Sequence, residues 1–145
     1  MTEYQSENEI REVVERFETC VFAAEEFTHA RHLTVACWYL STLSSDAALA
    51  RMREGLLRFT AHHGKHAYHE TLTRFWMLLL EEFLAGQSAE ALLMEKVNNA
   101  VRCFESKEVV FEYYSRERVL SEGARREWVE TDLQALPSGV VEKKA

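Results

Sequence analysis

The sequence predicts an all-α protein, an up-and-down helical bundle of four to five main helices with a short C-terminal helix and an extended tail. Helix-breaking residues are rare, since the 145 residues include one Pro and five Gly. Apolar residues make up 47% of the chain and recur at helical spacing over long stretches. The length suits one domain, which we place at residues 1–137, with residues 138–145 as a disordered tail.

Capping residues and breaks in the apolar pattern delimit the expected helices. Ser, Thr or Asp stands at most expected starts, where a side-chain oxygen can accept a hydrogen bond from a free backbone N–H. Gly64 suits the left-handed residue that follows a helix end. The main helices are expected over residues 6–24, 28–43, 46–63, 68–86 and 88–104. A shorter helix follows Ser106, a last turn or two follow Ser121, and residues 131–137 look extended.

Charge and hydropathy restrict the partners that we expect. The chain has 17 basic and 24 acidic residues, a net charge of −7, and no basic run that could neutralise phosphates, so we expect no nucleic acid. The longest apolar run, residues 75–80, is far shorter than the ~20 residues that span a bilayer, so we expect no membrane. The polar start lacks a secretory or transit signal, and the three cysteines fit buried thiols. These features predict a cytoplasmic protein.

The histidines are the most informative residues of the chain. All six lie between residues 27 and 71, close to the ends of expected helices. Short connections make successive helices antiparallel. The N-terminal ends of the second and fourth helices therefore lie at the same end of the bundle as the C-terminal ends of the first, third and fifth. A polar pocket is therefore predicted at that end.

Helical phase separates the histidines that face the core from those that do not. At 100° per residue, His29, His63 and His69 lie on the apolar faces of their helices, and His32 lies on the flank of the same face as His29. His62 points away from the apolar stripe of its helix. Glu70 lies at the edge of the inward face of the fourth helix.

These side chains have the chemistry of a metal or catalytic site. The positive end of a helix dipole disfavours imidazolium, so histidines at helix starts tend toward the neutral form that ligates metals or acts as a base. The same dipole stabilises a carboxylate, and histidines with one carboxylate resemble open iron and zinc sites. We take as candidate catalytic residues His29, His69 and Glu70. The candidate metal ligands are His29, His32, His63, His69 and Glu70.

Further residues are expected to contact a ligand bound in this pocket. Tyr68 and Thr73 would supply hydrogen bonds, and Trp76 and Tyr39 would supply an aromatic lining. Arg53 lies near the inward stripe of the third helix, where an unpaired charge would be costly. We expect it to pair with a buried carboxylate rather than with an anionic ligand.

Two motifs stand out at the predicted pocket. Residues 27–33 read FTHARHL and contain a His-x-x-His-Leu element, and residues 68–73 read YHETLT. Together with shorter stretches as far as Pro137, they resemble a family of small all-helical bacterial proteins without an assigned activity. The resemblance implies no substrate, cofactor or reaction. It marks as signature positions His29, His32, Tyr68, His69, Glu70 and Thr73.

Several functions fit these features. The first is a small-molecule-binding protein, which becomes a metal-dependent enzyme if a divalent transition metal such as iron or zinc is held by the histidines and the carboxylate. The second is a non-enzymatic interaction or sensor module whose histidines are structural. The third is haem binding through a single His axial ligand. An apolar face on the first helix is compatible with a homodimer as well as with the core.

Overall fold

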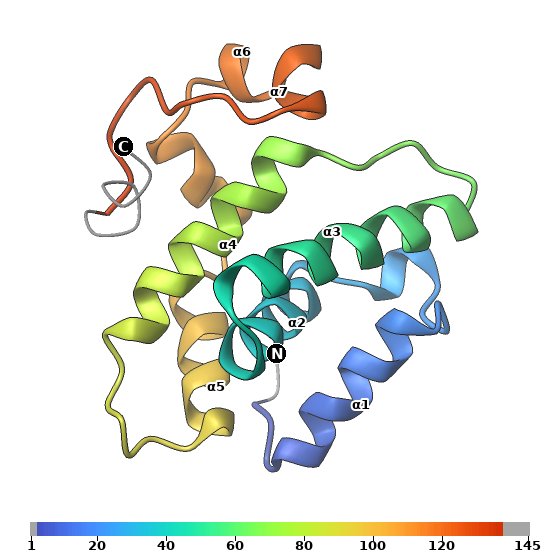
Figure 1. Ribbon diagram of the computed structural model, residues 1–145, viewed down its shortest axis with the longest axis vertical. Helices are drawn as coiled ribbons and strands as arrows, with labels where there is room; N and C mark the ends of the chain where they lie inside the picture. Colours follow the sequence, from blue (N-terminus) through green and yellow to red (C-terminus); the bar gives the residue numbers. More distant parts are fainter. Residues whose placement is uncertain (1–2, 138–145) are drawn as a thin grey trace.

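The computed structural model describes residues 3–137 and shows an all-α helical bundle, which confirms the predicted fold class (Figure 1). The main helices are α1 (Glu7–Glu18), α2 (His29–Thr42), α3 (Ser45–His62), α4 (Glu70–Ala85) and α5 (Leu93–Cys103). The shorter elements are the 3-10 helices η1 (Ala24–Glu26) and η2 (Lys107–Glu112) and the helices α6 (Arg116–Val119) and α7 (Glu122–Arg126). The expected disordered tail, residues 138–145, lies outside the described residues.

Helix α2 is the centre of the bundle and packs against α1, α3, α4 and α5. Five consecutive residues of α2, from Leu33 to Cys37, are buried, which is the pattern of a helix covered on all sides. The apolar stripe of α1, which includes Ile10, Val14 and Phe17, is buried in the same core. This stripe packs within the same chain, and nothing here tests the expected homodimer, which stays a prediction.

The residues after α5 form a second, smaller layer, which we call the C-terminal cover (residues 104–137). Figure 1 shows α6 and α7 lying above the start of α4. Phe75 and Leu79 of α4 pack there in a separate apolar cluster with residues of the cover, namely Val110, Tyr114, Val119 and Leu136. The hydroxyl of Thr71 also donates to the Glu127 carbonyl at 2.8 Å. The cover is thus fastened to the first turns of α4.

Three helix ends differ from the expected ones. Helix α1 ends at Glu18, because Cys20 has a left-handed φ of 58° and the Val21 N–H bonds back to the Arg16 carbonyl at 2.9 Å. Helix α5 begins at Leu93 instead of following Ser88, whose hydroxyl accepts from a nearby backbone N–H within a turn. Helix α4 begins at Glu70 instead of near Tyr68, and His69 is its N-cap. Gly64 has the predicted left-handed conformation, with φ of 65°.

None of the helices within residues 3–137 combines the length and the apolar character that crossing a membrane requires.

Candidate functional site

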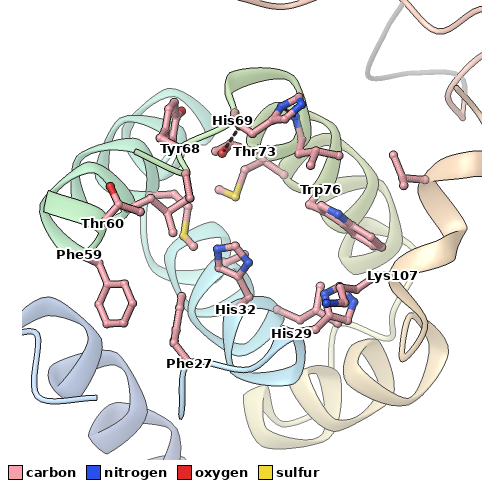
Figure 2. Close-up of a pocket in the computed structure, with 18 of the residues that line it drawn as sticks. Phe27, His29, His32, Phe59, Thr60, Tyr68, His69, Thr73, Trp76 and Lys107 are labelled. Atoms are coloured by element: carbon pink, nitrogen blue, oxygen red, sulfur yellow. Dashed lines mark hydrogen bonds between the residues drawn. The ribbon is translucent and has the colours of Figure 1, made fainter. Parts of the chain in front are cut away.

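A cavity of about 810 Å³ lies where α2, α3, α4 and the C-terminal cover meet (Figure 2). Four histidines line it, two from the first turn of α2, one just after α3 and one just before α4. These four, which helix parity and phase had predicted to face one pocket, are His29, His32, His63 and His69. His62, which was expected to point away, is exposed and does not line the cavity.

The wall of the cavity is mostly apolar. Its aromatic residues come from several segments, and its aliphatic residues come mainly from the three helices. They include Phe27, Phe59, Trp76, Phe111, Leu33, Met52, Leu56, Leu72, Met77 and Leu80. A concave site of roughly 300–1,000 Å³ with an apolar wall and a few polar groups is the usual form of a small-molecule site.

Three of the four histidines donate to backbone carbonyls of distant segments. The Nε2 atom of His29 lies 2.9 Å from the Phe104 oxygen, that of His63 lies 3.0 Å from the Phe22 oxygen, and that of His69 lies 2.7 Å from the Val119 oxygen. Since a carbonyl oxygen only accepts, each Nε2 carries a proton and donates it to that oxygen. These three rings therefore join segments of the fold.

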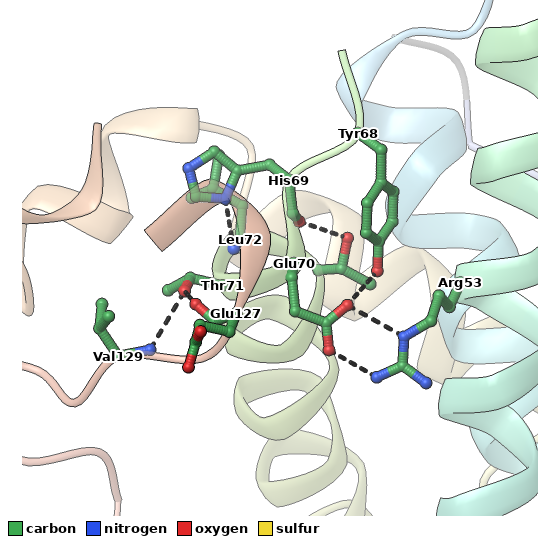
Figure 3. A network of polar contacts seen from close by, with 9 residues as sticks. Arg53, Tyr68, His69, Glu70, Thr71, Leu72, Glu127 and Val129 are labelled. Carbon is green, nitrogen blue, oxygen red and sulfur yellow. Dashed lines mark hydrogen bonds and ion pairs between the residues drawn. The ribbon is translucent and has the colours of Figure 1, made fainter. Parts of the chain in front are cut away.

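The second ring nitrogen of His69 is also occupied. Its Nδ1 atom accepts the Leu72 N–H at 3.1 Å and so caps the start of α4 (Figure 3). Burial lowers the pKa of His69, which keeps the ring in the neutral form that this cap requires. The expected role of His69 as a metal ligand or base needs a free nitrogen, and this arrangement leaves none.

His32 differs from the other three. Its Nε2 atom is buried and has no hydrogen-bond partner within the described residues. Its ring packs edge-on against Phe27, with the ring centroids 4.9 Å apart, and Figure 2 shows it pointing toward the cavity. Burial lowers the pKa of His32 to about 4, and the charges of His29, when that ring is protonated, and of Lys107 lower it further. The ring is therefore neutral at pH 7, with one N–H donor and one acceptor nitrogen.

Glu70 is held away from the cavity by an ion pair. Its Oε2 lies 2.5 Å from Nη2 of Arg53 and its Oε1 lies 2.9 Å from Nε of the same side chain (Figure 3). The Tyr68 hydroxyl donates to Oε1 at 2.6 Å. Arg53 thus pairs with a carboxylate as expected, and its hydrogen bonds lower the pKa of Glu70. Glu70 was a candidate metal ligand and catalytic residue, but both of its oxygens bind these neighbours instead.

The remaining predicted ligand contacts divide into two groups. Trp76, Tyr68 and Thr73 line the cavity, and the Trp76 ring packs edge-on against His29 with centroids 5.0 Å apart. Tyr39 was expected in the pocket but does not line it. It is buried against α1, where its hydroxyl donates to Oε2 of Glu18 at 2.5 Å.

No group of three His, Cys, Asp or Glu side chains is placed to hold a metal ion within residues 3–137. His29 and His32 both face the cavity, but Glu70 lies outside it and His69 has no spare nitrogen. Neither the iron or zinc site nor haem binding is tested by these contacts, and both stay predictions.

Sequence reasoning missed the contribution of the C-terminal cover to the cavity wall. Lys107, Phe111 and Arg116 all line the cavity, and Lys107 begins η2. No periodic apolar pattern marks Lys107 and Phe111, because η2 is a short 3-10 helix whose position depends on packing against α4. Arg116 begins α6, which is too short to show such a pattern.

Comparison of the chain with models of protein families, with curated proteins and with solved structures found no match.

Proposed function

We propose that this protein binds a small, largely apolar molecule in the cavity, with His32 as its polar contact. The observation that carries the proposal is the buried Nε2 atom of His32, which has no partner within residues 3–137 and whose ring adjoins a cavity of about 810 Å³. A buried polar atom without a hydrogen bond costs roughly 1–3 kcal/mol, which a ligand that supplies the bond would offset.

The chemistry of the wall supports the same kind of ligand. The apolar and aromatic side chains would cover the body of the molecule, as in most small-molecule sites. The other three histidines donate their Nε2–H groups to backbone carbonyls. His32 is therefore the imidazole best suited to bond a hydroxyl, carbonyl or carboxyl oxygen of the ligand.

The experiment is a fluorescence titration with N-phenylnaphthylamine, an uncharged apolar probe. Ala36 lines the cavity one turn after His32, so Ala36→Phe fills part of the space. The matched control is Ala61→Phe on the exposed face of α3, outside the cavity. We expect saturable binding to the wild type and to Ala61→Phe, and strongly weakened binding to Ala36→Phe. Absence of binding to the wild type, or equal binding to all three, contradicts the proposal.

The polar contact is tested separately with decanol as a competitor of the probe. His32→Phe keeps an aromatic ring but removes both ring nitrogens. We expect the affinity for decanol to fall roughly fivefold in this variant, which corresponds to the loss of one neutral hydrogen bond. Unchanged competition by decanol would remove His32 from the proposal.

A second candidate function is a non-enzymatic interaction or sensor module with structural histidines. The three bonds from His29, His63 and His69 to backbone carbonyls favour it. It predicts that alanine variants of these residues lower the melting temperature and that no probe shifts it. A wild type that is stabilised by decanol or by N-phenylnaphthylamine contradicts this function.

A further inference from the structure

Lys107 places a positive charge at the end of the cavity formed by His29 and His32. It lines the cavity, and Figure 2 shows it beside His29. None of the ion pairs among residues 3–137 involves it. Burial is the main cause that lowers the pKa of His29 and of His32, and the charge of Lys107 lowers both further. A positive field therefore reaches the two imidazoles.

Two long helices add to this field. Helices α2 and α4 both begin at the cavity, and the residues of their first turns line it. The N-terminal end of a helix carries a partial positive charge, which favours an anion nearby. This effect acts in the same direction as Lys107.

The charged residues that line the cavity have a small positive excess, although the whole chain is negative. Three cations and two carboxylates line the cavity, namely Lys65, Lys107, Arg116, Glu25 and Glu108. Arg116 pairs with Glu108 at 3.1 Å, which leaves two lysines against Glu25. The net charge of the chain is −7, so this excess is local to the cavity.

We propose that the ligand is an amphipathic carboxylate whose apolar body lies in the cavity and whose carboxylate is bound by Lys107 at the end formed by His29 and His32. This inference rests on the proposed function, since it names the class of molecule that the cavity takes. The Lys107 ammonium supplies the charge, and the neutral His32 ring can supply one N–H to a carboxylate oxygen. The same positive surroundings disfavour a divalent cation between the two imidazoles.

The experiment compares three molecules with the same alkyl chain and different head groups, each as a competitor of N-phenylnaphthylamine. They are decanoate, decanol and decylamine. We expect decanoate to bind about fivefold more tightly than decanol, because a charge-assisted contact at a partly exposed site contributes on the order of 1 kcal/mol. Decylamine should bind most weakly, and the advantage of decanoate should shrink as salt is added.

Variants of one lysine then locate the charge. Lys107→Met should bring the affinity for decanoate down to that for decanol in the wild type, and Lys107→Glu should favour decylamine over decanoate. The matched control is Lys96→Met on α5, which does not line the cavity and should keep the preference for decanoate. Circular dichroism checks that each variant is folded.

The outcomes separate the two proposals. If decanol and decanoate compete equally in the wild type, the carboxylate inference is overturned while the proposed function stands. Equal losses in Lys96→Met and Lys107→Met would also overturn it, because the preference would then reflect general charge. If neither the probe nor decanol binds, the proposed function fails and the inference fails with it.

Discussion

The Nε2–H group of His69 donates to the carbonyl of Val119 at 2.7 Å, across 50 positions of the chain. This bond fastens the start of α4 to the end of α6. Through its other nitrogen the same ring caps α4 at the Leu72 N–H. One side chain therefore fixes where a helix begins and holds the C-terminal cover against the cavity.

His69→Ala should lower the free energy of unfolding by about 2–3 kcal/mol, since it removes a helix cap and a buried hydrogen bond together. His69→Asn should recover about half of this loss, because Asn can cap α4 but is too short to reach Val119. Urea unfolding followed by circular dichroism measures both variants. An Asn variant no more stable than the Ala variant would show that the cap contributes nothing.

The pH dependence of stability should contain a contribution from His32. Its pKa is about 4 in the folded protein and near 6.5 when exposed, so the unfolded chain binds the proton first as the pH falls. Stability is therefore lost between about pH 6.5 and pH 4, by on the order of 3 kcal/mol in total. Urea unfolding of the wild type and of His32→Phe across this range isolates the contribution. Parallel curves for the two proteins would contradict the burial of His32.

The ion pair between Arg53 and Glu70 should be structural. A double-mutant cycle with Arg53→Met and Glu70→Gln should give a coupling energy of about 1–2 kcal/mol, because the carboxylate is mostly buried while the guanidinium is partly exposed. Arg53 lowers the pKa of Glu70, so this stabilisation is present above the ordinary Glu pKa and is lost as the pH falls below it.

Glu70→Gln also tests the role expected from the sequence. Glu70 lies outside the cavity, so this variant should bind N-phenylnaphthylamine as the wild type does. If Glu70→Gln abolished binding while the fold stayed intact, the carboxylate would have to reach the ligand, in contrast to its contacts in Figure 3.

The fold class and the meeting of four histidines could be predicted because both depend on local pattern and helix direction. Antiparallel neighbours follow from short connections, and phase follows from 3.6 residues per turn. The end of α1 could not be predicted, because Cys20 takes a left-handed conformation that usually calls for Gly.

The partners of the predicted side chains could not be read from the sequence. Tyr39 faces inward on α2, but a helix covered on all sides has several inward directions, and Tyr39 faces Glu18 of α1 instead of the cavity. Glu70 lies at the edge of its helix face and pairs with Arg53. The packing of α3 against α4 decides this partner, and the sequence pattern does not show it. Lys107 reaches the cavity through the tertiary position of η2.

Gly55 of α3 packs directly on the ring of Phe17. A Cβ atom at this position would lie 2.5 Å from Cε2 and 2.8 Å from Cζ of Phe17. The ring cannot easily move, because it is fully buried and stacks on Phe27 with centroids 4.6 Å apart. The contact therefore leaves no room for a methyl group.

Gly55→Ala should be destabilising despite the better helix propensity of Ala. The propensity gain is about 1 kcal/mol, whereas overpacking a rigid core site costs roughly 1–3 kcal/mol, so we expect a net loss of about 1 kcal/mol. Gly86→Ala is the matched control, since its Cβ would meet nothing closer than a backbone oxygen at 3.5 Å. Thermal unfolding should show a lower Tm for Gly55→Ala alone, and adding Phe17→Leu to that variant should reduce its penalty. A Gly55→Ala protein as stable as the wild type would mean that α1 and α3 pack less closely than these distances require.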